Sequence, residues 1–221
     1  INRMSSGPGL PITLYLLEHW QLGHITEDQL QDELRLLENL LARMVVNQNS
    51  LSPMRGLTMA MMGSIATAEA PARVASPKLL SEEIGRRIRQ SDDFFPRDED
   101  IKEKFNSEDF YGSSIKGDQL GAIFRGLERQ LAGAGAHPLP YGKQRDRFTV
   151  EHVFPQSCVN PPHGQWESDM PAEEAARLEL VRRVNRIGNL TLLTKGVNSS
   201  IKAQPFSRKK DVLGNADDDL S

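Results

Sequence analysis

Two short segments with strand character lie among longer segments whose periodicity is helical. The first, residues 148–154, alternates with a period of two and is followed by Pro155. The second is Gly188-Asn-Leu-Thr-Leu-Leu193. A helical pattern covers 171–184 between them, and another runs from Thr194 to Pro205. Strand, long connection, strand and helix is the order of a ββα unit, so we expect a mainly α protein of the α+β class.

Residues 1–140 are predicted to form a helical region. Thr26 and Gln29 have the spacing of a capping box, and leucines then recur at three- and four-residue steps along one helix face. Further helices are expected to begin near Ser81 and to cover 119–131, and the methionine-rich stretch 54–62 is interpreted as core. The Gly- and Pro-rich segment 133–140 marks the predicted boundary.

The net charge of −3 is unevenly distributed along the chain. Residues 1–140 carry 15 basic and 19 acidic side chains, giving −4, whereas residues 141–210 carry 12 and 7, giving +5. The last eleven residues add four aspartates and no base. With the boundary at the linker 133–140, we divide the chain into a helical region (1–140), a basic unit (141–212) that contains the ββα pattern, and an acidic tail (213–221). The basic unit is where a polyanion would bind most favourably.

The single cysteine, Cys158, limits both the compartment and the metal chemistry. One cysteine forms no internal disulfide, which indicates a reducing, cytoplasmic environment. It also excludes a structural zinc site built on two or more cysteines of this chain. No apolar run is long enough to cross a bilayer, so no membrane partner is expected. The chain begins with Ile1 rather than methionine, and we interpret it as a fragment of a longer protein.

The residues that carry chemistry are Glu151, His152, Asn189 and Asn198. Phosphodiester hydrolysis needs a base that takes a proton from water and a cation that stabilises the charge on the phosphate and the leaving oxygen. His152 has an ordinary pKa close to neutrality. Glu151 and the Asn198 amide oxygen are hard ligands that suit Mg²⁺ or Mn²⁺ better than zinc. Neighbouring side chains on a strand point to opposite faces, so Glu151 and His152 converge only if the strand ends or bends there.

Each of these residues taken alone has a commoner structural explanation. A lone histidine in a strand is more often structural, an asparagine at a helix start is more often an N-cap, and Asn189 after a glycine is more often a turn residue. The specificity of the pattern comes from the order and spacing of all four residues.

In this order and spacing the chain resembles the C-terminal HNH domain of GmrSD-type restriction proteins, a branch of the His-Me finger (ββα-metal) nucleases. The resemblance extends to a two-domain protein of bacterial phage defence that senses phosphorothioate-modified DNA. The resemblance is strong over 147–212 and looser over 10–140, where it includes Phe124-Arg-Gly-Leu-Glu128. The matching residues are Phe148-Thr-Val-Glu-His-Val-Phe-Pro-Gln-Ser157, Trp166, Val184-Asn-Arg-Ile-Gly-Asn-Leu-Thr-Leu-Leu193, Asn198, Phe206 and Lys209 or Lys210.

The resemblance implies a role for each residue of the pattern. His152 would be the general base, and Asn189 would tie the hairpin loop to the second strand and steady His152. Asn198 takes the place of the final histidine as a metal ligand. Glu151 stands where many of these nucleases have an aspartate ligand, and it is one methylene longer. The paired Cys-x-x-Cys motifs of many HNH domains are absent, so we expect no structural zinc, and packing around Phe148, Phe154, Trp166 and Phe206 would hold the fold instead. The expected catalytic cation is Mg²⁺ or Mn²⁺.

Basic residues flank this pattern and are candidates for contacts with DNA phosphates. Lys202 lies one turn after Asn198 on the predicted helix, and we assign it to the catalytic set. For any single one of the others, a solvent-exposed surface charge is at least as common an explanation. The other candidate DNA-binding residues are Arg186, Lys195, Arg208, Lys209 and Lys210.

The expected function is a metal-dependent DNA endonuclease domain of a bacterial restriction or phage-defence protein that nicks one strand. The resemblance further implies an N-terminal, nucleotide-hydrolysing sensor domain in the same chain, and assembly into a homo-oligomer is left open. Two alternatives stand beside it. The first is a DNA-binding or interaction module with little catalysis. The second is an RNase, because these residues do not distinguish DNA from RNA.

Overall fold

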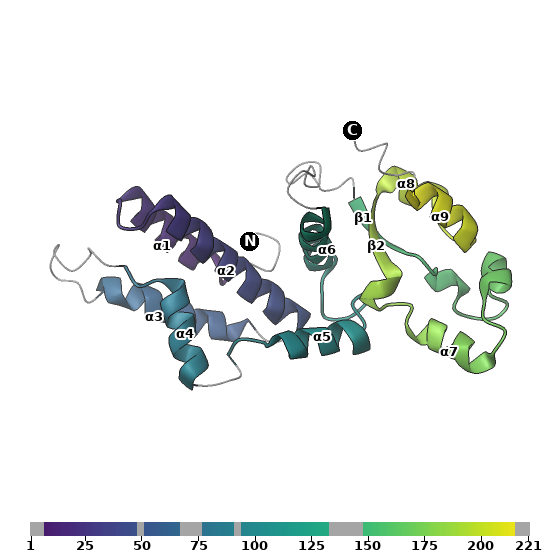
Figure 1. The fold of residues 1–221 in the computed structure, drawn as a ribbon, viewed down its shortest axis with the longest axis horizontal. Helices are drawn as coiled ribbons and strands as arrows, with labels where there is room; N and C mark the ends of the chain where they lie inside the picture. The colour runs from purple at the N-terminus through teal and green to yellow at the C-terminus, as the bar shows by residue number, and fades with distance from the viewer. Residues whose placement is uncertain (1–6, 48–50, 67–76, 91–93, 133–147, 215–221) are drawn as a thin grey trace. The chain divides into compact units, whose positions relative to one another are not determined.

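The computed structural model describes residues 7–47, 51–66, 77–90, 94–132 and 148–214. It divides the chain into two compact units, Ile1–Lys104 and Phe105–Ser221 (Figure 1). The described residues are mostly helical and contain a two-stranded antiparallel sheet, which confirms the mainly α, α+β expectation. Among them, no helix is both long and apolar enough to cross a membrane.

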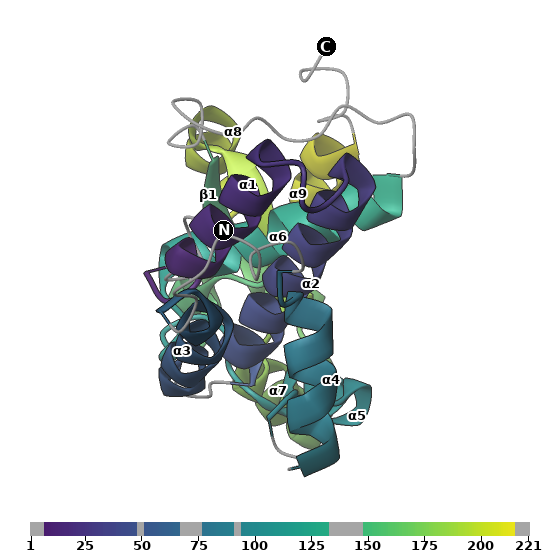
Figure 2. The same ribbon diagram turned by 90° about the vertical axis from the view of Figure 1, so that its left-hand side faces the viewer.

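The first unit is built from helices that bury one apolar face each, and they can be followed in Figure 2. Helix α1 contacts α2 and α3, and α4 contacts the same two helices. The core contains Ile12, Leu37 and Met54, all fully buried. The helices are α1 (Leu10–Gln21), α2 (Glu27–Val46), α3 (Ser52–Ala66) and α4 (Leu80–Gln90), and α5 (Asp98–Ser107) spans the division between the units.

The first turn of α2 and the methionines of α3 were both predicted from the sequence. The Thr26 hydroxyl accepts a hydrogen bond from the Gln29 backbone at 3.2 Å and the Gln29 side chain accepts one from the Thr26 backbone at 2.9 Å, so the predicted capping box is present. In the methionine-rich stretch, Met54 and Met61 are buried but Met59 is 67 % exposed. The core interpretation therefore holds for one face of α3.

The second unit is organised around a hairpin of two strands, β1 (Phe148–His152) and β2 (Leu190–Thr194). The strands pair antiparallel, with Phe148 opposite Thr194 and His152 opposite Leu190. Figure 1 shows this hairpin between α6 on one side and α8 and α9 on the other, and both α6 and α8 contact its two strands. The helices of this unit are α6 (Gly117–Ala132), α7 (Glu174–Arg182), α8 (Lys195–Ile201) and α9 (Phe206–Gly214).

Both strands are shorter than the sequence pattern predicts. Strand β1 ends at His152 rather than Phe154 because Asn189 takes up the next two backbone donors: Val153 N–H bonds to its carbonyl and Phe154 N–H to its side-chain oxygen. Strand β2 begins at Leu190 rather than Gly188 because residues 187–189 form a 3-10 turn. The predicted boundary at 140/141 lies outside the described residues, and α6, which the sequence analysis placed in the helical region, contacts both strands.

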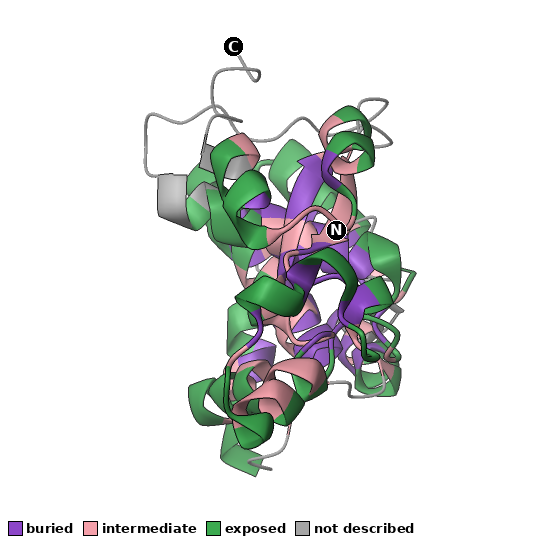
Figure 3. Ribbon diagram, turned by 90° about the vertical axis from the view of Figure 1, so that its right-hand side faces the viewer, coloured by how far each residue is buried: buried purple, intermediate pink, exposed green. Residues whose placement is uncertain are grey.

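The connection between the strands folds over a second small core. Figure 3 colours the ribbon by burial, and much of the outer surface of the helices is exposed (green). The ring of Phe154 meets Trp166 edge to face at 5.3 Å, and the Trp166 indole N–H donates to the Gln204 carbonyl at 2.8 Å. Of the aromatic residues expected to replace a structural zinc, Phe154 and Trp166 are buried, whereas Phe206 is 45 % exposed and packs on Trp166 at 6.1 Å. The cluster consists of Phe154, Cys158, Trp166, Met170 and Val184.

Candidate active site

His152 is the last residue of β1 and is held in a largely buried position. Its side chain is 8 % exposed, and its Nε2 lies 3.2 Å from the side-chain oxygen of Asn185. The Tyr111 ring packs against the imidazole nearly edge to face, with 4.5 Å between ring centroids. The imidazole is therefore fixed from two sides at the point where the strand ends.

The surroundings of His152 favour its neutral form. Burial lowers the pKa of His152, and the hydrogen bond to Asn185 and the charge of Glu151 oppose this lowering without cancelling it. A neutral imidazole has a nitrogen lone pair that can accept a proton, as a general base must.

Glu151 is engaged by a buried lysine. Lys209, from α9, is fully buried, and its ammonium group donates to Glu151 Oε1 at 2.6 Å and to the His152 carbonyl at 2.7 Å. The same ammonium lies 6.0 Å from the centre of the Trp166 ring. Lys209 is among the residues that the sequence predicts to contact DNA. The structure instead places this side chain in the interior, where its charge balances a carboxylate, so that assignment needs correction.

Asn198 lies on α8, and its amide nitrogen donates to the Thr149 hydroxyl at 2.7 Å. Thr149 and Glu151 are two residues apart on β1 and therefore share a face, whereas His152 points to the other. The structure thus brings Asn198 to the Glu151 face of the strand. His152 lies on the opposite face. Strand β1 does end at His152, which was the condition for the Glu151 and His152 side chains to converge, but the two side chains remain on different faces.

Asn189 lies between the hairpin and the connection that precedes β2. Its amide nitrogen donates to the carbonyls of Phe154 and Val184, at 2.9 and 2.7 Å, and its amide oxygen accepts from Phe154 N–H at 2.7 Å. Its backbone carbonyl accepts from Val153 N–H at 2.8 Å. These bonds join the residues directly after His152 to the start of β2, which is the kind of tie that the resemblance implies for Asn189.

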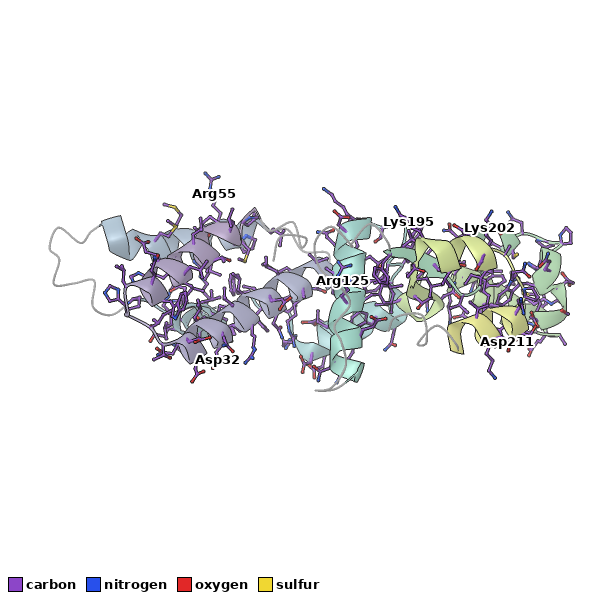
Figure 4. All side chains as sticks on the ribbon, turned by 90° about the horizontal axis from the view of Figure 1, so that it is seen from above. Asp32, Arg55, Arg125, Lys195, Lys202 and Asp211 are labelled. Carbon is purple, nitrogen blue, oxygen red and sulfur yellow. The ribbon has the colours of Figure 1, made fainter. Side chains whose placement is uncertain are left out.

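The remaining basic candidates differ in their surroundings. Lys195 and Lys202 are exposed, and Figure 4 shows both on the same side of the second unit, along α8. Lys202 was expected on the same helix as Asn198, but α8 ends at Ile201 and Lys202 directly follows it with a φ of 29°. Arg186 is half-buried and donates to the Asn106 carbonyl at 2.9 Å. Arg208 and Lys210 on α9 are exposed, in contrast to Lys209 between them.

The donors on the Glu151 face fit a hard divalent cation in kind. Within the described residues, no group of three or more histidine, cysteine or acidic side chains could hold a metal ion. Mg²⁺ needs no such group, because it keeps several water ligands and often binds through one or two carboxylates together with substrate phosphates. The Glu151 carboxylate engages Lys209 through Oε1, and the Asn198 amide bonds to Thr149 through its nitrogen. Glu151 Oε2 and the Asn198 amide oxygen are then the atoms that could bind the cation.

Three residues at this site were not singled out by the sequence pattern: Asn185, Tyr111 and Thr149. Asn185 lies inside the segment that carries the resemblance, but nothing in its spacing relates it to His152, which is 33 residues away. Tyr111 precedes α6, in the part assigned to the helical region. Thr149 has the ordinary strand alternation. Like Asn185, Thr149 lies inside a segment that carries the resemblance, and strand alternation adds that it shares a face with Glu151.

A family model described as the C-terminal domain of GmrSD restriction endonucleases matches residues 95–221, which include both strands, α8, α9 and all the site residues above. No curated protein and no solved structure matches the chain.

Proposed function

Because the chain belongs to the family of GmrSD restriction endonuclease C-terminal domains, we propose that it is a metal-dependent nuclease that cuts DNA with His152 as general base. The observation that carries this proposal is the buried imidazole of His152 at the end of β1, which contacts Asn185 and Tyr111 and has a lowered pKa. The proposal includes a role in bacterial restriction of phage DNA.

The chemical step begins at His152. Its neutral imidazole takes a proton from a water molecule as the water oxygen bonds to phosphorus. The bond between phosphorus and the 3′ oxygen then breaks, and the leaving oxygen takes up a proton from solvent. The products carry a 5′-phosphate and a 3′-hydroxyl. A Mg²⁺ or Mn²⁺ ion held by Glu151 and Asn198 would supply positive charge to the phosphate and to the leaving oxygen. Because His152 and Glu151 lie on opposite faces of β1, the phosphate would have to bind at the end of the strand, where both faces can be reached.

The surrounding residues hold these groups in place. Lys209 fixes the Glu151 carboxylate and the last carbonyl of β1, and Asn189 fixes the loop that follows. Lys195 and Lys202 are exposed, and their side chains would contact phosphates, which would position DNA without reading its sequence. Arg208 and Lys210 are exposed on α9, which contacts α8, and they are further candidates for phosphate contacts, as is the half-buried Arg186. One base with one cation cuts one strand, so the expected product is a nick.

A plasmid-nicking assay tests the proposal. Purified protein is incubated with supercoiled plasmid and Mg²⁺ or Mn²⁺, beside EDTA and a matched RNA substrate. We expect metal-dependent relaxation of the plasmid, abolished in His152→Ala and retained in Ser157→Ala, an exposed neighbour. Full cleavage by His152→Ala would exclude this residue as the base. Folded protein that cuts no DNA with either metal, or that cuts only RNA, would overturn the proposed function.

A further inference from the structure

Asn185 connects three segments of the second unit. Its side-chain oxygen lies 3.2 Å from His152 Nε2 and accepts a hydrogen bond from Gln156 Nε2 at 2.8 Å. Its backbone carbonyl accepts from the N–H groups of Phe110 and Tyr111, at 2.8 and 3.1 Å. The end of β1, the turn after Pro155 and the segment before α6 therefore meet at this one residue.

The chemistry of the amide oxygen decides which nitrogen of His152 carries the proton. A carboxamide oxygen only accepts hydrogen bonds, so both nitrogens that point at it must bear hydrogen. Gln156 Nε2 always does. In the neutral imidazole one nitrogen is a donor and the other an acceptor, so a proton on Nε2 leaves the lone pair on Nδ1.

We propose that Asn185 is the positioning residue of the general base: it holds His152 as the Nε2–H tautomer and leaves Nδ1 to accept the proton from water. This inference rests on the proposed function for the role of His152, but the tautomer itself is a property of the protein without substrate. Asn185 acts through His152 and needs no contact with DNA.

The same residue also holds the ring in its orientation. Tyr111 packs edge to face against the imidazole, and the Tyr111 backbone is anchored on the Asn185 carbonyl. Asn185 thus fixes one edge of His152 directly and the aromatic wall of His152 through the backbone. Asn189 has a different task, because its amide bonds to backbone atoms of Phe154 and Val184 and so positions the loop.

Nuclear magnetic resonance of the whole chain with ¹⁵N-labelled histidine tests the tautomer. Long-range ¹H–¹⁵N correlations at about pH 8, above the ordinary histidine pKa, distinguish the two tautomers. The His152 signals are identified by their loss in His152→Gln. We expect Nε2–H in the unaltered protein and in Asn185→Asp, which keeps an accepting oxygen, and a mixture or Nδ1–H in Asn185→Leu. Gln156→Leu, which leaves the Asn185 oxygen in place, should keep Nε2–H. An Nδ1–H tautomer in the unaltered protein would overturn the proposal even if Asn185→Leu does not fold.

Kinetics connect the tautomer to the reaction. We expect Asn185→Leu to lower kcat by roughly 10- to 100-fold with little change in KM, because the second partner of a catalytic imidazole affects its orientation rather than substrate binding. Asn185→Asp should recover most of kcat. A folded Asn185→Leu protein with unchanged kcat and tautomer would refute the positioning role. If the tautomers behave as expected but His152→Ala still cuts DNA, Asn185 sets the tautomer of His152 but His152 is not the general base, and the positioning role in catalysis is refuted.

Discussion

At the scale of single residues, Asn189 is the most heavily bonded polar side chain of the site. It satisfies the backbone of Phe154 on both its donor and its acceptor side, and it also binds the Val184 carbonyl. Asn189→Ala would leave these backbone groups without their partner. Since each hydrogen bond contributes about 1 kcal/mol and an unsatisfied buried group costs about 1–3 kcal/mol, we expect a loss of roughly 3 kcal/mol.

Urea unfolding measures this loss, and Asn198→Ala is the matched control. The Asn198 amide makes one hydrogen bond, to the Thr149 hydroxyl, so its removal should cost about 1 kcal/mol or less. Equal unfolding midpoints for the two variants would mean that the tie through Asn189 contributes little to the fold.

The residues of the site were predictable to different degrees. Glu151, His152, Asn189 and Asn198 stand out in the sequence because their order matches a known pattern. Their partners do not, because the contacts join residues far apart in the chain: Lys209 Nζ and the His152 carbonyl are separated by 57 positions. From the sequence, Lys209 is expected at the surface together with its basic neighbours. Charge alone does not show which of three consecutive cations faces inward, and the structure selects the one opposite Glu151.

At the scale of elements, α9 is attached to β1 through this lysine. Lys209→Met keeps an apolar stem of similar length but leaves the Glu151 carboxylate without its cation. Removing one partner of a buried ion pair commonly costs about 3–5 kcal/mol, and we expect a loss near the lower end because the Glu151 side chain is 13 % exposed.

Thermal or urea unfolding checks this loss against Lys210→Met, which alters the exposed neighbour on the same helix. The control should change the free energy of unfolding by less than about 0.5 kcal/mol. A Lys209→Met protein as stable as the control would show that the ion pair does not hold α9 on the strand.

Helix α4 carries a second buried carboxylate, and here the expected effect depends on pH. The Glu83 side chain is fully buried and pairs with Arg86, Lys78 and Arg87. Hydrogen bonding to Arg86, with further contributions from Lys78 and Arg87, lowers the pKa of Glu83 from 4.5 to about 2. The folded-state pKa is below the unfolded one, so the unfolded state binds the proton first. The stabilisation is therefore complete above about pH 5 and is lost as the pH falls toward 2.

The measurement is the urea midpoint between about pH 6 and pH 2.5, for the unaltered protein and for Glu83→Gln. We expect Glu83→Gln to be less stable at pH 6 and to lose less stability on acidification, so that the two curves approach each other. Glu82→Gln, an exposed neighbour, should follow the unaltered protein. Parallel curves for Glu83→Gln and the unaltered protein would contradict the lowered pKa.

Element types were predictable from local signals, and their ends were not. The capping box of α2 and the two strand segments are encoded in a few neighbouring residues. The last residue of β1 is set by Asn189, which lies 35 positions from Phe154 and takes up the backbone donors of the next two residues. A local pattern contains no information about such a partner.

At the scale of the whole molecule, the basic charge lies in the C-terminal part of the chain, where the +5 excess of residues 141–210 contrasts with the −4 of residues 1–140. The sequence identified this asymmetry, but the structure changes which cations belong to the exposed set. Lys195, Lys202, Arg208 and Lys210 are exposed, whereas the charge of Lys209 is balanced inside. DNA binding should therefore depend on the exposed set alone.

Salt dependence of binding measures how many of these cations meet phosphates. The affinity of the His152→Ala protein for duplex DNA, followed by fluorescence anisotropy, should fall linearly with salt on logarithmic axes. Lys195→Ala and Lys202→Ala should each reduce the slope by about 0.9 if each side chain neutralises one phosphate. Arg35→Ala removes an exposed cation of α2, in the acidic part of the chain, and should leave the slope unchanged. If Arg35→Ala reduces the slope and the two lysine variants do not, DNA binds elsewhere on the chain and the basic surface along α8 is ordinary solvent-exposed charge.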